Sequence, residues 1–405
     1  MNTLLVAATS AFLFLAPFAG SAGLRAGLLT VAGVVLLTQP RALRSLVGAL
    51  PRVVLAAFTT WCVLAAASLA WSENRGYTLG ELKSEILYPA MALAIFYAAA
   101  AIAPMRWRLW WRALLAGSAV MLAGLLLQEV LPFALSRHSV VEQRGPWSTH
   151  LVLVAPLLFV FAWPPPWGEG RPPWMQAVAL AVLLLAAWQT QNRVMWVALG
   201  LQLLLAMALW RTLPAMEPTR LRDLRRLTIA AAAIVAVAFA AALFERNERF
   251  FGENAPMSTS FERDLRPRIW SKGVEQWRAA PLVGHGFGRE IAAPAFVPLT
   301  PHVADHPEIR HAHNTFLDVA VSLGVVGVFT LVVLLGSLVR EYALYLRRPD
   351  VAPFGVLGLT LIAGFLVKNL TDDFMYRHNA LVFWSLNGML LGLGHAARER
   401  AARRN

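Results

Sequence analysis

The residues best suited to chemistry lie at the end of a long polar segment, residues 245–314. Five of its residues are histidines, and two of them, His311 and His313, stand directly before a long apolar run. A neutral imidazole held at such a place can accept a proton near pH 7. His313 lies at the mouth of the expected helix and is the candidate base. His311 would point elsewhere once the segment is helical, so we assign it a supporting role.

The same histidines suggest a second chemistry, because imidazole is a common zinc ligand. His302 and His306 are four residues apart, but Pro301 and Pro307 flank them and disfavour a regular helix. The single cysteine, Cys62, lies inside an apolar run, which excludes a cysteine-based metal site and intrachain disulfides. The sequence therefore favours one imidazole acting as a base, with no metal or cofactor, over a zinc site built from several histidines.

Arg193 lies in a short polar turn between two apolar runs, beside Trp196. An arginine costs about 2.5–3.5 kcal/mol at the centre of a bilayer and less at the interface. One interpretation is an interfacial anchor. The other is a ligand for an anion at the outer leaflet, with the surrounding backbone amides as further donors.

A second basic site lies inside the long segment and contains Arg263, Arg266 and Arg268. Pro267 suits the first turn of a helix, and Trp270, Val274 and Trp277 follow at the spacing of one helix face. Free N–H groups at the start of a helix favour an anion, and the guanidinium fork suits phosphate oxygens. The arginines either bind phosphate or only balance neighbouring carboxylates.

Further charges expected on the same side of the membrane are Arg75, Lys83, Arg137, Arg144, Asp372, Asp373 and Arg377. Together they predict a basic cavity above the outer leaflet, which would suit a lipid diphosphate. The glycine-rich residues 281–288 lack the strand and helix of a nucleotide-binding unit, so we interpret them as a tight turn.

The elements that must position these residues are membrane helices. The chain of 405 residues is 58% hydrophobic, and apolar runs of membrane-spanning length recur along it. Such runs must be helical in lipid, because no water satisfies the backbone there. We expect an all-α integral membrane protein in one polytopic domain, residues 1–405. Its twelve expected spans are 3–20, 23–38, 53–71, 86–103, 113–131, 149–163, 174–190, 194–210, 227–244, 315–339, 354–369 and 380–394.

The orientation follows from the distribution of basic residues. With both termini inside, the inner connections carry 19 Lys/Arg against 6 acidic residues, whereas the long segment carries nine of each sign. Most of the net charge of +13 is therefore a topology signal, and not a nucleic-acid-binding surface. The first apolar run lacks the basic start of a signal peptide, and we keep it as a span.

Three motifs together resemble the superfamily of O-antigen ligases and Wzy-type polymerases. They are Asn192-Arg193-Val194-Met195-Trp196, then Arg266-Pro267-Arg268-Ile269-Trp270 with Pro281 and the glycines that follow it, and His311-Ala312-His313-Asn314-Thr315-Phe316-Leu317 with Gly324 and Gly327. The similarity covers residues 190–330 well, while the N-terminal half agrees only in topology.

The resemblance implies a GT-C-type, metal-independent glycosyltransferase at the periplasmic face of a bacterial inner membrane. Its donor would be a polysaccharide on undecaprenyl diphosphate, and the acceptor of a ligase would be a sugar hydroxyl of the lipid A–core oligosaccharide. His313 would be catalytic, and Arg193 with Arg266 or Arg268 would bind the diphosphate. The long segment would cover the cavity as a lid.

Three other functions are weighed against the ligase. A Wzy-type polymerase uses the same donor but typically has two sizeable external loops. A protein O-oligosaccharyltransferase shares the histidine motif but usually has more sequence after its last span. A transporter of lipid-linked glycans predicts charges deep within several spans, whereas the charges here lie mainly at one face.

Overall fold

The computed structural model describes residues 2–38, 50–130, 144–162, 173–190, 192–209, 218–251, 264–300 and 308–403. These residues are mostly helical, and no strand occurs among them, which confirms the expected all-α class. The described α-helices are α1 (Asn2–Leu15), α2 (Ala22–Leu37), α4 (Arg52–Ala67), α5 (Arg75–Glu81), α6 (Tyr88–Ile102), α7 (Trp107–Val130), α8 (Arg144–Val154), α9 (Pro173–Thr190), α10 (Arg193–Leu209), α11 (Pro218–Phe251), α13 (Arg266–Ala279), α14 (Ala293–Phe296), α15 (Thr315–Tyr345), α16 (Ala352–Asn369) and α17 (Arg377–Ala402).

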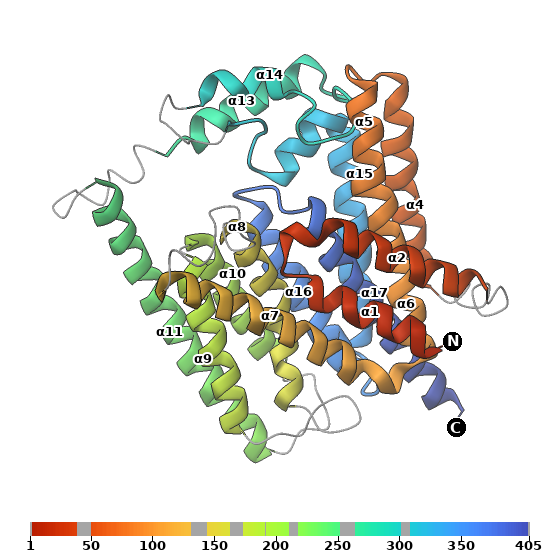
Figure 1. Ribbon diagram of the computed structural model, residues 1–405, viewed down its shortest axis with the longest axis vertical. Helices are drawn as coiled ribbons and strands as arrows, with labels where there is room; N and C mark the ends of the chain where they lie inside the picture. Colours follow the sequence, from red (N-terminus) through yellow and green to blue (C-terminus); the bar gives the residue numbers. More distant parts are fainter. Residues whose placement is uncertain are drawn as a thin grey trace.

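Each of the twelve expected spans falls on a helix. Within the described residues, six helices are long and apolar enough to cross a membrane: Arg52–Ala70, Arg75–Ile102, Pro104–Leu127, Thr315–Tyr345, Ala352–Asn369 and Arg377–Ala402. The other expected spans are shorter apolar helices. In Figure 1, α1, α2 and α7 run across the direction of α4, α6 and α15. These helices fit a multi-pass membrane protein, while the number twelve remains a prediction.

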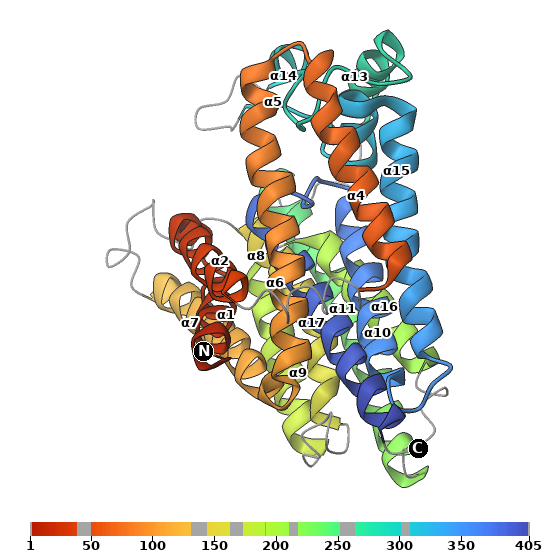
Figure 2. The same ribbon diagram turned by 90° about the vertical axis from the view of Figure 1, so that its right-hand side faces the viewer.

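The centre of the bundle is α17, which packs closely against α6. Gly388 and Gly392 of α17 face the carbonyl groups of Leu93 and Tyr97, and a Cβ atom at either glycine would overlap these carbonyls. Small residues allow two membrane helices to approach this closely. Figure 2 shows α6 and α17 in the body of the molecule, with α13 and α14 gathered at one end. That end carries the candidate site.

Helix α15 is interrupted at Gly324, whose backbone angles (φ 65°, ψ −163°) are not helical. Residues 281–286 of the long segment lie against this interruption and supply the hydrogen bonds that the helix loses there. The N–H groups of His285 and Gly286 donate to the carbonyls of Val321 and Ser322, at 3.1 and 2.9 Å. Val325 and Val326 donate in return to Pro281 and Leu282, at 2.9 and 3.3 Å.

The glycines at 284, 286 and 288 all have positive φ angles, as a tight turn requires. A Cβ atom at Gly284 would overlap the backbone of Ser322, so the close approach to α15 depends on its absence. The interpretation of residues 281–288 as a turn is confirmed. The turn is joined to α15 by four backbone hydrogen bonds, and the expectation that the long segment covers the cavity as a lid remains a prediction.

Helix α13 begins at Arg266 with Pro267 in its first turn, as predicted. Its most buried residues are Ile269 and Gly273, and the expected stripe of Trp270, Val274 and Trp277 is only half-buried. Helix α13 contacts α15 at Gly273, where a Cβ atom would overlap the side chain of Leu317. This contact holds the start of α13 near the first turn of α15.

Candidate functional site

His313 occupies a defined position at the start of α15. Asn314 caps this helix, since its Oδ1 accepts hydrogen bonds from the N–H groups of Phe316 (3.0 Å) and Leu317 (3.1 Å). His313 itself has a φ angle of 51°, in the left-handed region that non-glycine residues rarely adopt. Such strain persists where the surrounding structure fixes it, and it is frequent at functional sites.

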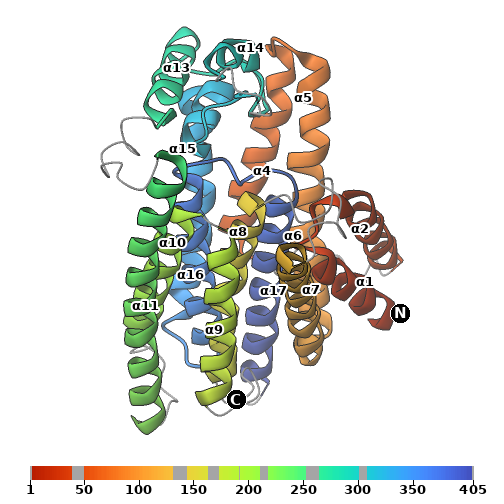
Figure 3. The ribbon, with the colours of Figure 1, turned by 60° about the vertical axis from the view of Figure 1, so that its left-hand side comes forward.

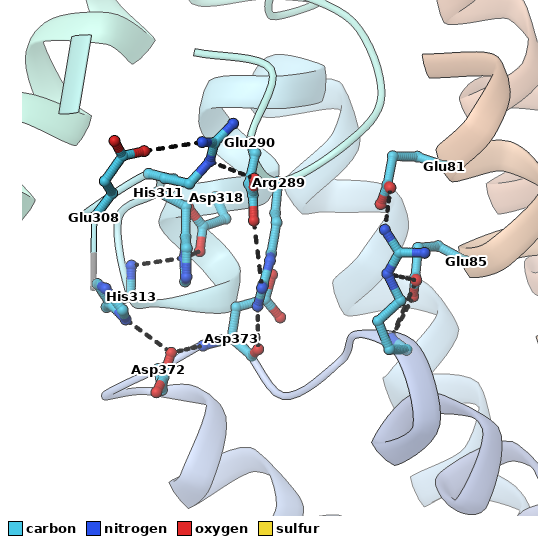
Figure 4. A network of polar contacts seen from close by, with 12 residues as sticks. Glu81, Glu85, Arg289, Glu290, Glu308, His311, His313, Asp318, Asp372 and Asp373 are labelled. Atoms are coloured by element: carbon cyan, nitrogen blue, oxygen red, sulfur yellow. Dashed lines mark hydrogen bonds and ion pairs between the residues drawn. The ribbon is translucent and has the colours of Figure 1, made fainter. Parts of the chain in front are cut away.

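The imidazole of His313 is paired with a carboxylate from a distant part of the chain. Its Nδ1 lies 2.9 Å from Oδ1 of Asp372, in the connection between α16 and α17 (Figure 4). Burial raises the pKa of Asp372, but the hydrogen bond from His313 and the charges of His313 and His311 outweigh it, and the pKa lies well below its usual value. An ionised Asp372 accepts a hydrogen bond from the Nδ1–H group of His313, which leaves Nε2 of His313 as the nitrogen that can take up a proton.

His311 lies beside His313, with the ring centres 4.1 Å apart. Its Nδ1 is 3.0 Å from Oδ2 of the buried Asp318, which also accepts a bond from the N–H of Ala312 at 2.7 Å. Burial lowers the pKa of His311, but the charge and hydrogen bond of Asp318 outweigh burial and raise it. His311 therefore pairs with Asp318 of α15, and the expectation that it would point elsewhere than His313 is wrong, because the two rings lie side by side. Its supporting role remains a prediction.

The connection after α16 joins the elements of the site through its backbone and its side chains. The carbonyl of Thr371 accepts from Nε of Arg266 at 3.3 Å, and the carbonyl of Asp373 accepts from Arg289 at 3.1 Å. The Asp373 carboxylate lies 2.8 Å from the hydroxyl of Thr315. Burial and the charge of Asp318, partly offset by Arg289, raise the pKa of Asp373 to about 6.

A cavity of about 450 Å³ adjoins the connection between α16 and α17. It lies between α10, α11, α16 and the start of α13. Figure 3 shows α10, α11 and α16 alongside one another below α13. Three cationic side chains line the cavity, from Arg193, Arg266 and Lys368. Its remaining lining residues are Thr190, Asn192, Val194, Val197, Phe239, Leu243, Asp264, Thr371, Asp372 and Phe374.

Each of the two predicted arginines reaches this cavity from a helix start. Arg193 is the first residue of α10, whose N–H at Met195 is capped by Oδ1 of Asn192 at 3.1 Å. Arg266 is the first residue of α13 and also pairs with Asp264, at 3.0 Å. Two helix N-termini with their arginines thus converge on one cavity, which is a favourable setting for an anion.

The third cation, Lys368, was not singled out in the sequence. It lies near the end of α16 and is fully buried, with its Nζ 2.8 Å from Oγ of Ser148 in α8. The same Nζ lies 4.6 Å from the centre of the Phe374 ring. A buried lysine is costly to keep without an anion nearby, and this one faces the same cavity as the two arginines.

The structure separates the two arginines between which the sequence could not choose. Arg266 lines the cavity, whereas Arg268 is exposed and does not line it. Lys83 is also exposed, with its Nζ 6.0 Å from the Tyr88 ring. Arg377 is bound to Glu81 at 2.8 Å, away from the cavity lining.

The positions of several other candidate side chains are not described by the structure. Arg137, Arg263, His302 and His306 lie outside the described residues. Arg144 is the first residue of α8, but its side chain is not among those described. Their expected contributions to the basic cavity and to a zinc site remain predictions.

Within the part of the chain that the structure describes, one group of side chains could hold a metal ion. The ligand atoms of His311, His313 and Asp372 all lie within 4.8 Å of one another. Two imidazoles and a carboxylate match the ligands that zinc prefers. However, Nδ1 of His313 is paired with Asp372 and Nδ1 of His311 with Asp318. The arrangement therefore suits an oriented base as well as it suits a metal.

Asp372, Lys368 and Arg289 are the residues near the site whose positions the sequence did not reveal. Asp372 was noted only as one external charge among several. The signal for Lys368 is a charge at the end of an otherwise apolar run, and Arg289 follows the glycine turn directly. The Arg289 guanidinium stacks 3.5 Å above the Tyr376 ring, so it helps to fix the connection that carries Asp372.

Comparison with known proteins supports the motifs. No curated protein matches the chain. Residues 167–332 match the family model described as O-Antigen ligase, and this range contains Arg193, Arg266 and His313. Asp372 and Lys368 lie outside the matched range but meet these residues in space. The resemblance seen in the three motifs is confirmed over residues 167–332, which match the O-antigen ligase family model.

Proposed function

We propose that this protein is an O-antigen ligase, which transfers a polysaccharide from undecaprenyl diphosphate to a sugar hydroxyl of the lipid A–core oligosaccharide. The observation that carries the proposal is one cavity with two kinds of lining. Arg193, Arg266 and Lys368 provide cations, while Val197 and Leu243 belong to an apolar wall on α10 and α11. A lipid diphosphate has a matching division between an anionic group and a hydrocarbon chain.

The link between this cavity and the base is Asp372, which lines the cavity and also binds His313. A diphosphate held by Arg193 and Arg266 would therefore place the first sugar of the donor near His313. Proximity of this kind is a large part of the rate acceleration that an enzyme can supply.

The chemistry is a single displacement. The acceptor hydroxyl attacks the anomeric carbon, its proton passes to Nε2 of His313, and the bond between that carbon and the diphosphate oxygen breaks. The charge that develops on the leaving diphosphate is stabilised by Arg193, Arg266 and Lys368, which supply what a metal ion supplies in other enzymes. Attack from the side opposite the diphosphate inverts the anomeric centre.

The expected topology agrees with this proposal. A GT-C-type arrangement with the site at the periplasmic face of the inner membrane would give access to both lipid-linked substrates. The basic connections at the other end of the helices, among them the one with Arg347 and Arg348, are of the kind that remains cytoplasmic. Both termini would then be cytoplasmic.

The test is performed in cells that lack the gene and carry either the natural protein or the His313→Ala variant. Lipid-linked polymer that accumulates beside bare core, and disappears only with the natural protein, would support a ligase. Core bearing a single repeat unit would instead show a polymerase, and transfer at the natural level by a normally inserted His313→Ala protein would refute the assigned base.

A further inference from the structure

A second basic cavity lies at the opposite end of the helix bundle. It measures about 650 Å³ and is formed where α4 begins and where α15 and α17 end. The end of α17, with the C-terminus, lies at the far end from α13 and α14 in Figure 2. Its lining residues are Pro51, Arg52, Val53, Arg340, Glu341, Arg348, His395, Arg398, Glu399, Ala401 and Ala402.

One of its arginines is held in place by buried partners. Arg398 donates to Oε1 of Glu341 at 3.0 Å and to the hydroxyl of Tyr345 at 2.8 Å. Glu341 is 7% exposed and Tyr345 is 1% exposed, so both partners are fixed within the bundle. The guanidinium of Arg398 is therefore preorganised at the cavity wall.

The other arginines leave an excess of positive charge. Arg348 pairs with Asp350 at 3.1 Å. Arg52 and Arg340 are exposed, and neither forms an ion pair with a carboxylate among the described residues. The lining carries four arginines against two glutamates, Glu341 and Glu399. A cavity with this balance attracts an anion.

The level of the cavity along the membrane normal indicates the source of the anion. Arg340 follows Thr315 by 25 residues along α15, which corresponds to about 38 Å at the rise of an α-helix. The two headgroup layers of a bilayer bracket about 40–45 Å. With Thr315 at one membrane surface, Arg340 therefore lies at the level of the lipid headgroups of the other leaflet.

Exposed apolar side chains lie on the two helices that carry Arg52 and Arg340. Val53 is 46% exposed beside Arg52, and Val339 is 38% exposed beside Arg340. Val332 and Val333, about two turns before Arg340 on α15, are also exposed. A cationic cavity that continues into an apolar helix surface has the division of charge and hydrocarbon that a phospholipid has.

We propose that this cavity binds the phosphate of an anionic phospholipid from the leaflet opposite the candidate site. The headgroup would lie between Arg52, Arg340 and Arg398, with its acyl chains along α4 and α15. Basic pockets between membrane helices at the cytoplasmic side bind anionic lipid headgroups in this manner. This proposal does not depend on the proposed glycan transfer.

The test measures lipid binding to the full-length protein in detergent by native mass spectrometry and by thermal unfolding. The ligands are phosphatidylglycerol, phosphatidylcholine and inorganic phosphate. The variant is the double change Arg52→Gln/Arg340→Gln, at two exposed positions. The matched control, Arg225→Gln/Arg226→Gln, removes two exposed arginines of α11 that do not line the cavity.

Phosphatidylglycerol should bind the natural protein and raise its unfolding temperature. Binding should weaken about 30-fold in the double variant, because each arginine near an anionic lipid contributes roughly a fivefold factor. The control should bind normally. Equal binding of phosphatidylcholine, or unchanged binding by the double variant, would overturn the proposal. If inorganic phosphate raised the unfolding temperature as much as phosphatidylglycerol does, the ligand would be a free anion and the proposal of a lipid would be refuted.

Discussion

His313 and Asp372 are 59 residues apart in the sequence, and in the folded protein Nδ1 of one lies 2.9 Å from Oδ1 of the other. The pair joins the end of the long polar segment to the connection between α16 and α17. It also joins the proposed base to the cavity that Arg193, Arg266 and Lys368 line. The orientation of His313 thus depends on the same residue that borders the proposed diphosphate.

We expect Asp372→Asn to lower kcat by about tenfold or more, because the amide cannot hold the imidazolium that forms when the base accepts a proton. The KM for the lipid-linked donor should change much less. Steady-state transfer with purified protein separates the two constants. Asp372→Glu should recover part of kcat, whereas an unchanged kcat in Asp372→Asn would show that the pair has no part in the reaction.

Arg266→Ala should weaken binding of the donor by roughly 10- to 100-fold, the effect of losing a charge-assisted hydrogen bond worth about 1.5–3 kcal/mol. Arg266→Lys should not restore binding fully, since the ammonium lacks the planar fork. Arg268→Ala is the matched control, because Arg268 is exposed on the same helix and outside the cavity lining. Equal losses in the two alanine variants would contradict the placement of the diphosphate.

The pair of His311 with Asp318 predicts a pH dependence of stability. The folded-state pKa of His311 is raised by Asp318 above its usual value near 6.5. Its contribution to stability is therefore fully present below pH 6.5 and is lost as the pH rises through the folded-state pKa.

Unfolding temperatures measured from pH 5 to pH 9 should fall more steeply for the natural protein than for His311→Gln. The control is Arg268→Gln, an exposed change that removes no histidine and should keep the natural slope in this range. A His311→Gln protein with the same slope as the natural one would show that the pair does not control this dependence.

Removal of metal ions should leave transfer within about twofold of its original rate, since arginines can supply the positive charge for the leaving group. The measurement is transfer after dialysis against EDTA. Activity that is lost on dialysis and returns with zinc would instead assign a metal to His311, His313 and Asp372, whose ligand atoms lie within 4.8 Å of one another.

Gly324→Ala should destabilise the protein, because the backbone angles at this position are nearly restricted to glycine and cost about 1–3 kcal/mol in other residues. A Cβ atom there would also overlap the backbone of Leu282. Gly336→Ala on the same helix is the control, since a Cβ atom there meets nothing within 4 Å. Thermal unfolding should show a lower midpoint only for the first variant, and equal midpoints would contradict the proposed role of the interruption.

The sequence predicted the helical class and the starts of α13 and α15 well, because both depend on nearby residues. The apolar run after His313, and the arginine and proline at the start of α13, are local signals for helices. The choice between Arg266 and Arg268 as the phosphate ligand could not be made from nearby residues. Two residues along a helix turn the side chain by about 200°, so the answer depends on which face packs against α15.

The partners of the site could not be predicted for a similar reason. Asp372 and Lys368 reach it through the packing of α16 against α10 and α15, which no spacing within the sequence expresses. The interruption of α15 was also hidden, because residues 315–339 read as one continuous apolar run. The folded structure shows why the turn and α15 each need a glycine: a Cβ atom at Gly284 would overlap the backbone of Ser322 in α15, and one at Gly324 would overlap the backbone of Leu282 in the turn.

The four backbone hydrogen bonds between residues 281–286 and α15 bear on how a substrate could enter. Lifting that turn would leave buried N–H and C=O groups without partners, at a cost of about 1–3 kcal/mol for each. Residues 281–286 do not line the cavity of Arg193, Arg266 and Lys368, whose wall on α10 and α11 is apolar at Val194, Val197 and Phe239. A donor would therefore reach the cavity with the turn in place, and a lipid-linked donor would enter along this apolar wall, by diffusion within the plane of the bilayer.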